Sequence, residues 1–109
     1  MSKIVGTYTN PSLNSTLNIA ASDDGSGAFN GTLSVGAIQI PFKGVWNTTT
    51  VSPNGILSFT GSTLTPSSMQ VAGAAQTDDS NVFSSISLGF TVVQKGAPAM
   101  SVCGRFTRR

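Results

Sequence analysis

The chain has 109 residues, of which 39% are hydrophobic and only 9% are charged, so one domain spanning 1–109 is expected. Three of its basic residues, Arg105, Arg108 and Arg109, lie at the C-terminal end of a chain whose net charge is +2. These features exclude the clustered basic face of a nucleic-acid-binding protein, and no apolar run approaches the ~18 residues of a membrane span.

The dominant pattern is an alternation of apolar and polar residues with period two, which is typical of β-strands. No segment carries the capped apolar stripe of a helix. Eight segments are predicted as strands: 4–10, 13–21, 28–35, 37–47, 56–64, 69–76, 82–94 and 99–107.

In the first two strands, the alternation places polar groups on an otherwise apolar face. The first strand carries Ile4, Gly6, Tyr8 and Asn10 on one face, and the second carries Leu13, Ser15, Leu17 and Ile19. If these faces point inward, the side chains of Asn10 and Ser15 are buried polar groups that need partners.

Turn residues separate the predicted strands. Residues 22–27 combine Asp and Gly, which support a turn, and a tight turn is expected at Gly36. Pro41 lies inside the fourth strand, where the missing N–H predicts an irregularity or a gap in the ladder. Lys43 alternates with Phe42 and is expected to face solvent, as is Arg105 in the last strand.

Eight short strands joined by short turns favour an up-and-down antiparallel meander. Closure into a barrel removes exposed edges, and eight strands leave room for packed side chains or one small ligand. A sandwich of two sheets is the competing architecture.

Few residues in the chain offer catalytic or metal chemistry. There is no His, and the single cysteine, Cys103, lacks a base to activate it. The two Asp pairs, 23–24 and 78–79, lie beside Gly or Ser and are read as solvated turns, because a calcium site needs more convergent oxygens. We therefore expect a protein that is not an enzyme.

The segments 6–10, 13–17, 27–32 and 42–47 resemble the first four strands of the avidin/streptavidin family. They read Gly-Thr-Tyr-Thr-Asn, Leu-Asn-Ser-Thr-Leu, Gly-Ala-Phe-Asn-Gly-Thr and Phe-Lys-Gly-Val-Trp-Asn. Later the resemblance thins to Phe59, Gly73 and residues 102–107. It implies an eight-stranded avidin-like barrel, dimeric or tetrameric, with biotin at one end.

The resemblance also implies site residues. Asn10 and Ser15 match positions that bond the ureido oxygen of biotin, and Leu13 matches a pocket residue. The full set of candidate ligand-binding residues is Asn10, Leu13, Ser15, Leu33, Ser34, Trp46, Phe59 and Phe90. Trp46 is interpreted first as a core or interface aromatic.

Several family features are replaced in this chain. Leu33 stands where the family has a third ureido donor, a Tyr, and the family's Asp of the last strand falls near Phe106. The loop that closes over biotin is reduced to Val35 and Gly36. Because each missing buried hydrogen bond costs roughly 1–3 kcal/mol, biotin is expected to bind weakly.

A second resemblance concerns a family of high-mannose-binding lectins built from β-barrel repeats. Residues 22–25, 29–34 and 40–44 are similar to one such repeat, although the Trp-Gly-Gly motif of that family is missing. This resemblance implies carbohydrate binding.

The sequence thus predicts a non-enzymatic binding protein with biotin or a biotin-like ligand, no cofactor, and a homo-oligomeric state, dimer or tetramer. Two alternatives stay open: a lectin-like barrel, and a structural or assembly barrel without ligand. Inward Leu33, Phe90 and Phe106 together would favour the last. No signal peptide is predicted, and the location, cytoplasmic or secreted by a non-classical route, is left open.

Overall fold

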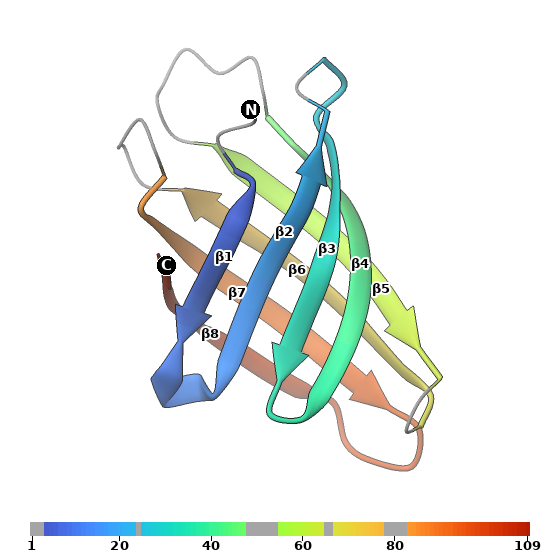
Figure 1. Cartoon of the computed structure of the whole chain (residues 1–109). Coiled ribbons are helices and arrows are strands. Elements are labelled where there is room, and N and C mark those ends of the chain that lie inside the picture. Colours follow the sequence, from blue (N-terminus) through green and yellow to red (C-terminus); the bar gives the residue numbers. More distant parts are fainter. Residues whose placement is uncertain (1–3, 24, 48–54, 65–66, 78–82) are drawn as a thin grey trace.

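The computed structural model describes residues 4–23, 25–47, 55–64, 67–77 and 83–109. They form eight antiparallel strands closed into a barrel in the order β1 to β8 (Figure 1). The strands are β1 (Gly6–Asn10), β2 (Ser15–Ser22), β3 (Ala28–Val35), β4 (Ile38–Trp46), β5 (Ile56–Thr63), β6 (Met69–Thr77), β7 (Ser85–Gln94) and β8 (Met100–Arg108).

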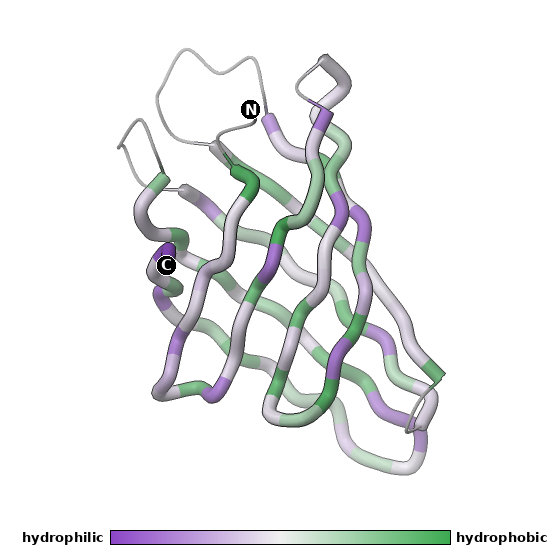
Figure 2. The backbone as a smooth tube through the Cα atoms, in the orientation of Figure 1, coloured by the Kyte–Doolittle hydropathy of each residue, from purple (hydrophilic) through white to green (hydrophobic). Residues whose placement is uncertain are grey.

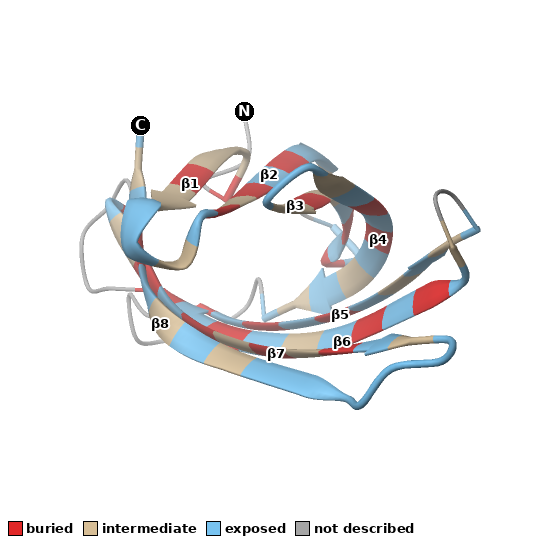
Figure 3. Ribbon diagram, turned by 90° about the horizontal axis from the view of Figure 1, so that it is seen from below, coloured by how far each residue is buried: buried red, intermediate tan, exposed pale blue. Residues whose placement is uncertain are grey.

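The predicted all-β, eight-stranded antiparallel up-and-down barrel is confirmed. Each strand pairs with the next, and β8 returns to pair with β1 through Tyr8 with Arg108 and Thr9 with Thr107. This closing pair excludes the sandwich of two separate sheets. Seen from below, β1 to β4 line one side of the barrel and β5 to β8 line the other (Figure 3).

The predicted alternation also holds in three dimensions. Buried and exposed residues alternate along most strands, as the banding of Figure 3 and the hydropathy colours of Figure 2 illustrate. In β2, Ser15, Leu17 and Ile19 are buried while Asn18 and Ala20 are exposed. Strand faces that alternate in this way bury one face in the barrel and leave the other in water.

Phenylalanines packed against glycines fill the middle of the barrel. Strands β3, β4 and β5 each carry Phe-x-Gly with both named residues facing inward, at 29–31, 42–44 and 59–61. In the antiparallel register each Phe therefore lies opposite a Gly: Phe42 pairs with Gly31 and Gly61, and Phe59 pairs with Gly44.

The rings of this layer touch one another. The centroids of Phe29 and Phe42 are 5.9 Å apart, and those of Phe42 and Phe59 are 4.8 Å apart. A ring needs the space that a Cβ would occupy: a Cβ at Gly73 would lie 2.5 Å from Cζ of Phe59. The aromatic rings of the core therefore pack directly against the backbone of the glycines.

The connection between β1 and β2 corrects one prediction. Residues Pro11–Leu13 form a short 3-10 helix, η1, so Leu13 does not begin the second strand, which starts at Ser15. The cause is local: the Asn10 side chain accepts a bond from the Leu13 N–H, Pro11 suits the first turn, and Asn14 takes a left-handed conformation with φ of 50°.

The seventh strand begins later than predicted, at Ser85. Phe83 has a φ of 49°, a left-handed conformation that a strand does not contain. Residue 82, where the strand was predicted to begin, lies outside the described residues, as does most of the predicted loop 47–54.

Pro41 lies where one edge of β4 has no ladder, as its missing N–H led us to expect. It pairs with Thr32 of β3, whereas the ladder between β4 and β5 begins only at Phe42 with Gly61. The tight turn predicted at Gly36 is also present, with a φ of 61°. Residues 38–41 of β4 are therefore not paired with β5.

Candidate functional site

Three of the predicted site residues come together at one end of the barrel. Asn10 pairs directly with Ser15, and Leu13 lies in the connection between them. A Cβ at Gly104 of β8 would lie 2.9 Å from both Asn10 Nδ2 and Leu13 Cδ1, so these two side chains lie over Gly104. Together they form the barrel end nearest η1.

The polar atoms at this end bond to the backbone. The Asn10 amide Nδ2 donates to the Arg105 carbonyl at 3.0 Å, and its Oδ1 accepts from the Leu13 N–H at 3.2 Å. The Ser15 hydroxyl donates to the Leu13 carbonyl at 2.9 Å. These bonds hold η1 in place and join it to β8. The side chains of Asn10 and Ser15, which the resemblance assigns to the ureido oxygen, therefore have structural roles in this barrel.

The interior behind Asn10 and Ser15 is filled by apolar side chains. Leu33 lies one layer deeper, between Leu17 and Ile40, and is fully buried. Phe90 and Phe106 also face inward, with 3% and 0% of their surface exposed. Leu33, Phe90 and Phe106 thus all point inward, which is the arrangement expected of a barrel filled by its own side chains.

The remaining predicted site residues lie apart from this end. Phe59 belongs to the aromatic layer in the middle of the barrel. Ser34 pairs with Thr16 and Gln39. In all three strands the adjacent residue points into the barrel, so Ser34 lies on the outer surface.

Trp46 lies at the opposite end of the barrel and is half-buried. Its indole Nε1 donates to the Ser22 hydroxyl at 2.9 Å, and its ring meets Phe83 edge-on at 6.2 Å between centroids. This packing fits the interpretation of Trp46 as a core aromatic, and it places Trp46 away from Asn10.

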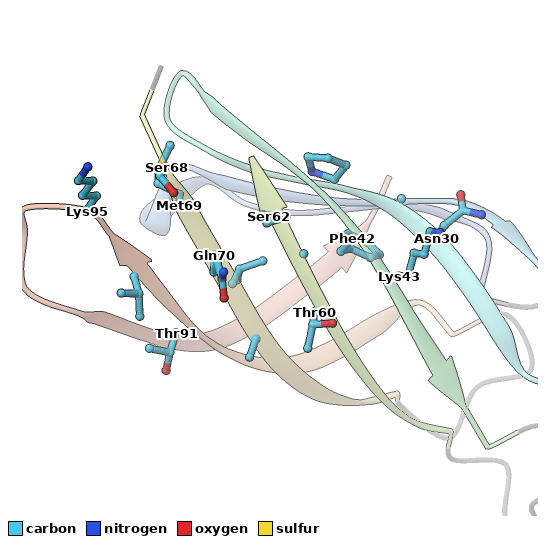
Figure 4. A pocket seen from close by; sticks show the side chains of 16 residues that line it. Asn30, Phe42, Lys43, Thr60, Ser62, Ser68, Met69, Gln70, Thr91 and Lys95 are labelled. Atoms are coloured by element: carbon cyan, nitrogen blue, oxygen red, sulfur yellow. The ribbon is translucent and has the colours of Figure 1, made fainter. Parts of the chain in front are cut away.

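A hollow, here called the outer groove, is lined by outward-facing residues of β3 to β7 and also reaches the buried side chains of Phe42, Met69 and Val71. It has a volume of about 1150 Å³. Two rows of cross-strand neighbours cross it, and Figure 4 labels several members of both rows together with other lining residues. The first row is Asn30, Lys43, Thr60, Ala72 and Thr91, and the second is Ser62, Gln70 and Val93.

The separation of β4 from β5 contributes to this groove. Pro41 and Gly61, where the two strands part, both line it. The two strands are still in close contact at this point, because a Cβ at Gly61 would lie 2.1 Å from the Pro41 carbonyl oxygen and only glycine permits this approach. The groove is thus bordered by the strand irregularity that Pro41 marks.

The outer groove has more apolar than polar lining surface, its polar groups are concentrated in the two rows, and its described lining lacks negative charge. Its described lining offers hydroxyl groups from Thr60 and Thr91 and amide groups from Asn30 and Gln70, with no Asp or Glu among them. Lys43 and Lys95 supply the charged side chains. Hydroxyls and amides both donate and accept, so the groove can bond a neutral polar or an anionic ligand.

The outward position predicted for Lys43 is correct, whereas the groove that Lys43 lines was not predicted. The signal was the repeated Phe-x-Gly, because inward Phe and Gly force the central residue outward on three neighbouring strands. Those central residues are Asn30, Lys43 and Thr60, and they pair in register.

The remaining candidates for chemistry have structural or surface positions. Asp23 is exposed, and its carboxylate accepts from the Gly25 N–H at 2.9 Å and from the Ser26 hydroxyl, as a turn residue does. The partner Asp24 and the pair 78–79 lie outside the described residues. Within the described ranges no group of three or more His, Cys, Asp or Glu is placed to hold a metal ion, and Cys103 is exposed.

A scan against protein-family models gave no match, and a search of curated proteins gave none either. Among the described residues, no helix is long and apolar enough to cross a membrane. The family resemblances therefore rest on the quoted residues alone.

Proposed function

We propose that the protein is a non-catalytic binding protein that takes a carbohydrate in the outer groove. The observation that carries this proposal is the register-matched row of amide, ammonium and hydroxyl side chains in a hollow of about 1150 Å³. The barrel supplies a rigid support for that row, since each member lies on a strand.

The size of the groove supports an extended ligand. Pockets for small molecules have volumes of roughly 300–1,000 Å³, and the groove is slightly larger. It is also more open than enclosed, which suits a ligand of several linked units better than a compact one. An oligosaccharide has this shape.

The lining chemistry supports the same class of ligand. Sugars present hydroxyl groups that donate and accept hydrogen bonds. The side chains of Asn30, Thr60 and Gln70 can likewise act as donors and as acceptors. The apolar groups of Pro41 and Val93 lie beside them and offer contact to the C–H faces of a sugar ring. Asn30, Pro41 and Lys43 also lie within the segments that resemble the lectin repeat.

The barrel interior supports a ligand less well. Leu33 and Phe106 are fully buried, and the side chains of Asn10 and Ser15 are already bonded to the backbone. A ligand there would have to displace these bonds or the packed layer. With no His in the chain, a non-catalytic role follows more naturally than an enzymatic one.

The test is a glycan array that includes neutral and acidic oligosaccharides, followed by calorimetry on the strongest ligand. Gln70→Ala and Asn30→Ala should each weaken binding by roughly twofold to tenfold, the value of one hydrogen bond. Ser87→Ala is the matched control, because Ser87 is exposed on β7 and does not line the groove. Loss of binding equal in all three variants would remove the groove as the site.

A second candidate is a biotin-like urea at the barrel end nearest η1. The observation that favours it is the convergence of Asn10, Leu13 and Ser15 there. Such a ligand would exchange the bond from Ser15 to Leu13 for one to itself, so weak affinity is expected. Calorimetry with biotin tests it: no heat at high protein concentration removes biotin, whereas binding that Ser15→Ala weakens and Gln70→Ala does not would favour this end over the groove.

A further inference from the structure

Strand β8 is fully paired on one side and only partly paired on the other. Residues 100–107 of β8 pair with β7. On the opposite side, the ladder with β1 contains only Arg108 with Tyr8 and Thr107 with Thr9. Within the described residues, the stretch from Met100 to Gly104 therefore has a ladder on one side alone, and Figure 3 shows β8 as the outermost strand of its side of the barrel.

Printed hydrogen bonds fix which backbone groups point to the open side. The Arg109 N–H donates to Thr7 of β1, whereas the Arg108 N–H donates to Ser84 on the β7 side. Backbone groups alternate in direction along a strand, so the odd-numbered residues of β8 point away from β7. The Arg105 carbonyl agrees, because it accepts the Asn10 amide on that side.

Ser101 and Cys103 therefore present two N–H and two C=O groups at the open edge. In the part of the chain that is described, no backbone hydrogen bond reaches these four groups. From Gly104 onward the edge is covered, since Leu13 and Asn10 of η1 and β1 lie over it. The open edge, defined as Met100–Cys103, is thus a short strip that ends where η1 and β1 cover Gly104.

The open edge lacks the features that usually keep strand edges apart. Proteins protect such edges with charged side chains, Pro or a covering element. The strip contains no charged residue and no Pro, and the outward side chains of Ser101 and Cys103 are small and exposed. Met100 adds an apolar side chain that is 46% exposed. Another strand can therefore approach this backbone without a steric or electrostatic barrier.

We propose that a second copy of this chain pairs with the open edge, β8 against β8, as an antiparallel two-fold dimer. Ser101 then lies opposite Cys103 of the second copy, with the two-fold axis at Val102. This pairing places edge-pointing residues opposite one another and satisfies all four open groups of each copy with four hydrogen bonds. The β5 to β8 sides of the two barrels become one continuous sheet.

Other two-fold registers fit the strip less well. With Cys103 opposite itself, Ser101 faces Arg105, whose carbonyl is already bonded to Asn10. With Ser101 opposite itself, Cys103 faces Ala99, which precedes the strand that begins at Met100. Only the register centred on Val102 uses the strip alone. The inference concerns the edge and does not rest on the proposed ligand.

Sedimentation of the intact chain over a range of concentrations tests the proposal, with a reversible dimer as the expected result. Ser101→Pro removes an N–H that points away from β7, so the monomer keeps its ladder while the dimer loses two of its four bonds. We expect its dimer dissociation constant to rise at least about tenfold, with Ser101→Ala as the unchanged control. A chain that stays monomeric at high micromolar concentration, or a dimer that Ser101→Pro leaves intact, overturns the proposal.

Cross-linking keeps the test decisive even if Ser101→Pro fails to fold. Ser101→Cys places a thiol directly opposite Cys103 of the second copy, where paired Cα atoms lie about 5.5 Å apart, within disulfide range. Mild oxidation should then give a covalent dimer on a non-reducing gel. Thr107→Cys is the control, because Thr107 is exposed on β8 where β1 already occupies the edge. Equal cross-linking in both variants overturns the proposed register.

Discussion

The aromatic layer predicts that Gly44→Ala severely destabilises the barrel. Gly44 pairs with Phe29 on one side and with Phe59 on the other. An added methyl group at this position would lie 2.0 Å from the Ser58 carbonyl oxygen and 2.8 Å from Cζ of Phe29. The first contact is with backbone, so a side-chain rotation cannot relieve it.

The magnitude follows from the cost of overpacking. Extra methylene groups in a packed core cost typically about 1–3 kcal/mol, and a backbone clash belongs at the upper end of that range. We expect Gly44→Ala to lower the free energy of unfolding by about 3 kcal/mol. For a domain of this size, 1 kcal/mol changes the Tm by roughly 4–8 °C, so the Tm should fall by roughly 12–24 °C.

Gly89→Ala is the matched control, since Gly89 also lies within a strand of the barrel. A Cβ there would meet Cys103 Cβ at 3.7 Å and the Val102 carbonyl at 3.8 Å, which are ordinary contacts. Its expected effect is a gain of roughly 0.4–1 kcal/mol, from lower entropy of the unfolded chain. Urea titration followed by the fluorescence of Trp46, the single tryptophan, measures both variants. Equal midpoints for the two would refute the reasoning.

Two further predictions concern polar contacts at the two ends of the barrel. Asn10→Ala removes the cap of η1 and the bond to the Arg105 carbonyl, so it should cost about 1–2 kcal/mol of stability in urea titration; an unchanged midpoint would mean that these bonds carry no net stability. Trp46→Phe removes the bond to Ser22 and should cost about 1 kcal/mol in thermal unfolding followed by circular dichroism. Ser22→Ala should cost a similar amount, and the double variant should cost less than the sum of the two, whereas full additivity would deny the contact.

The strand pattern was predictable because it is local. Alternation with period two marks all eight strands, and the turn at Gly36 follows from a residue that tolerates positive φ. The inward positions of Tyr8, Leu17 and Phe42 follow from the same alternation. One error fell where a side chain competes with the backbone, because Asn10 caps η1 and takes Leu13 out of the strand. Another fell at Phe83, whose left-handed backbone delays the start of β7.

The sequence by itself determined the eight strands, the inward faces and the meeting of Asn10 with Ser15 across one connection. Only the tertiary structure decided what those groups do, because the partner of the Asn10 amide, Arg105, lies 95 residues away. The same holds for the outer groove, whose row of side chains depends on the register of five strands, and for the open edge of β8. Periodicity fixes the direction of each side chain along its own strand, whereas the stagger between strands arises only when the barrel closes.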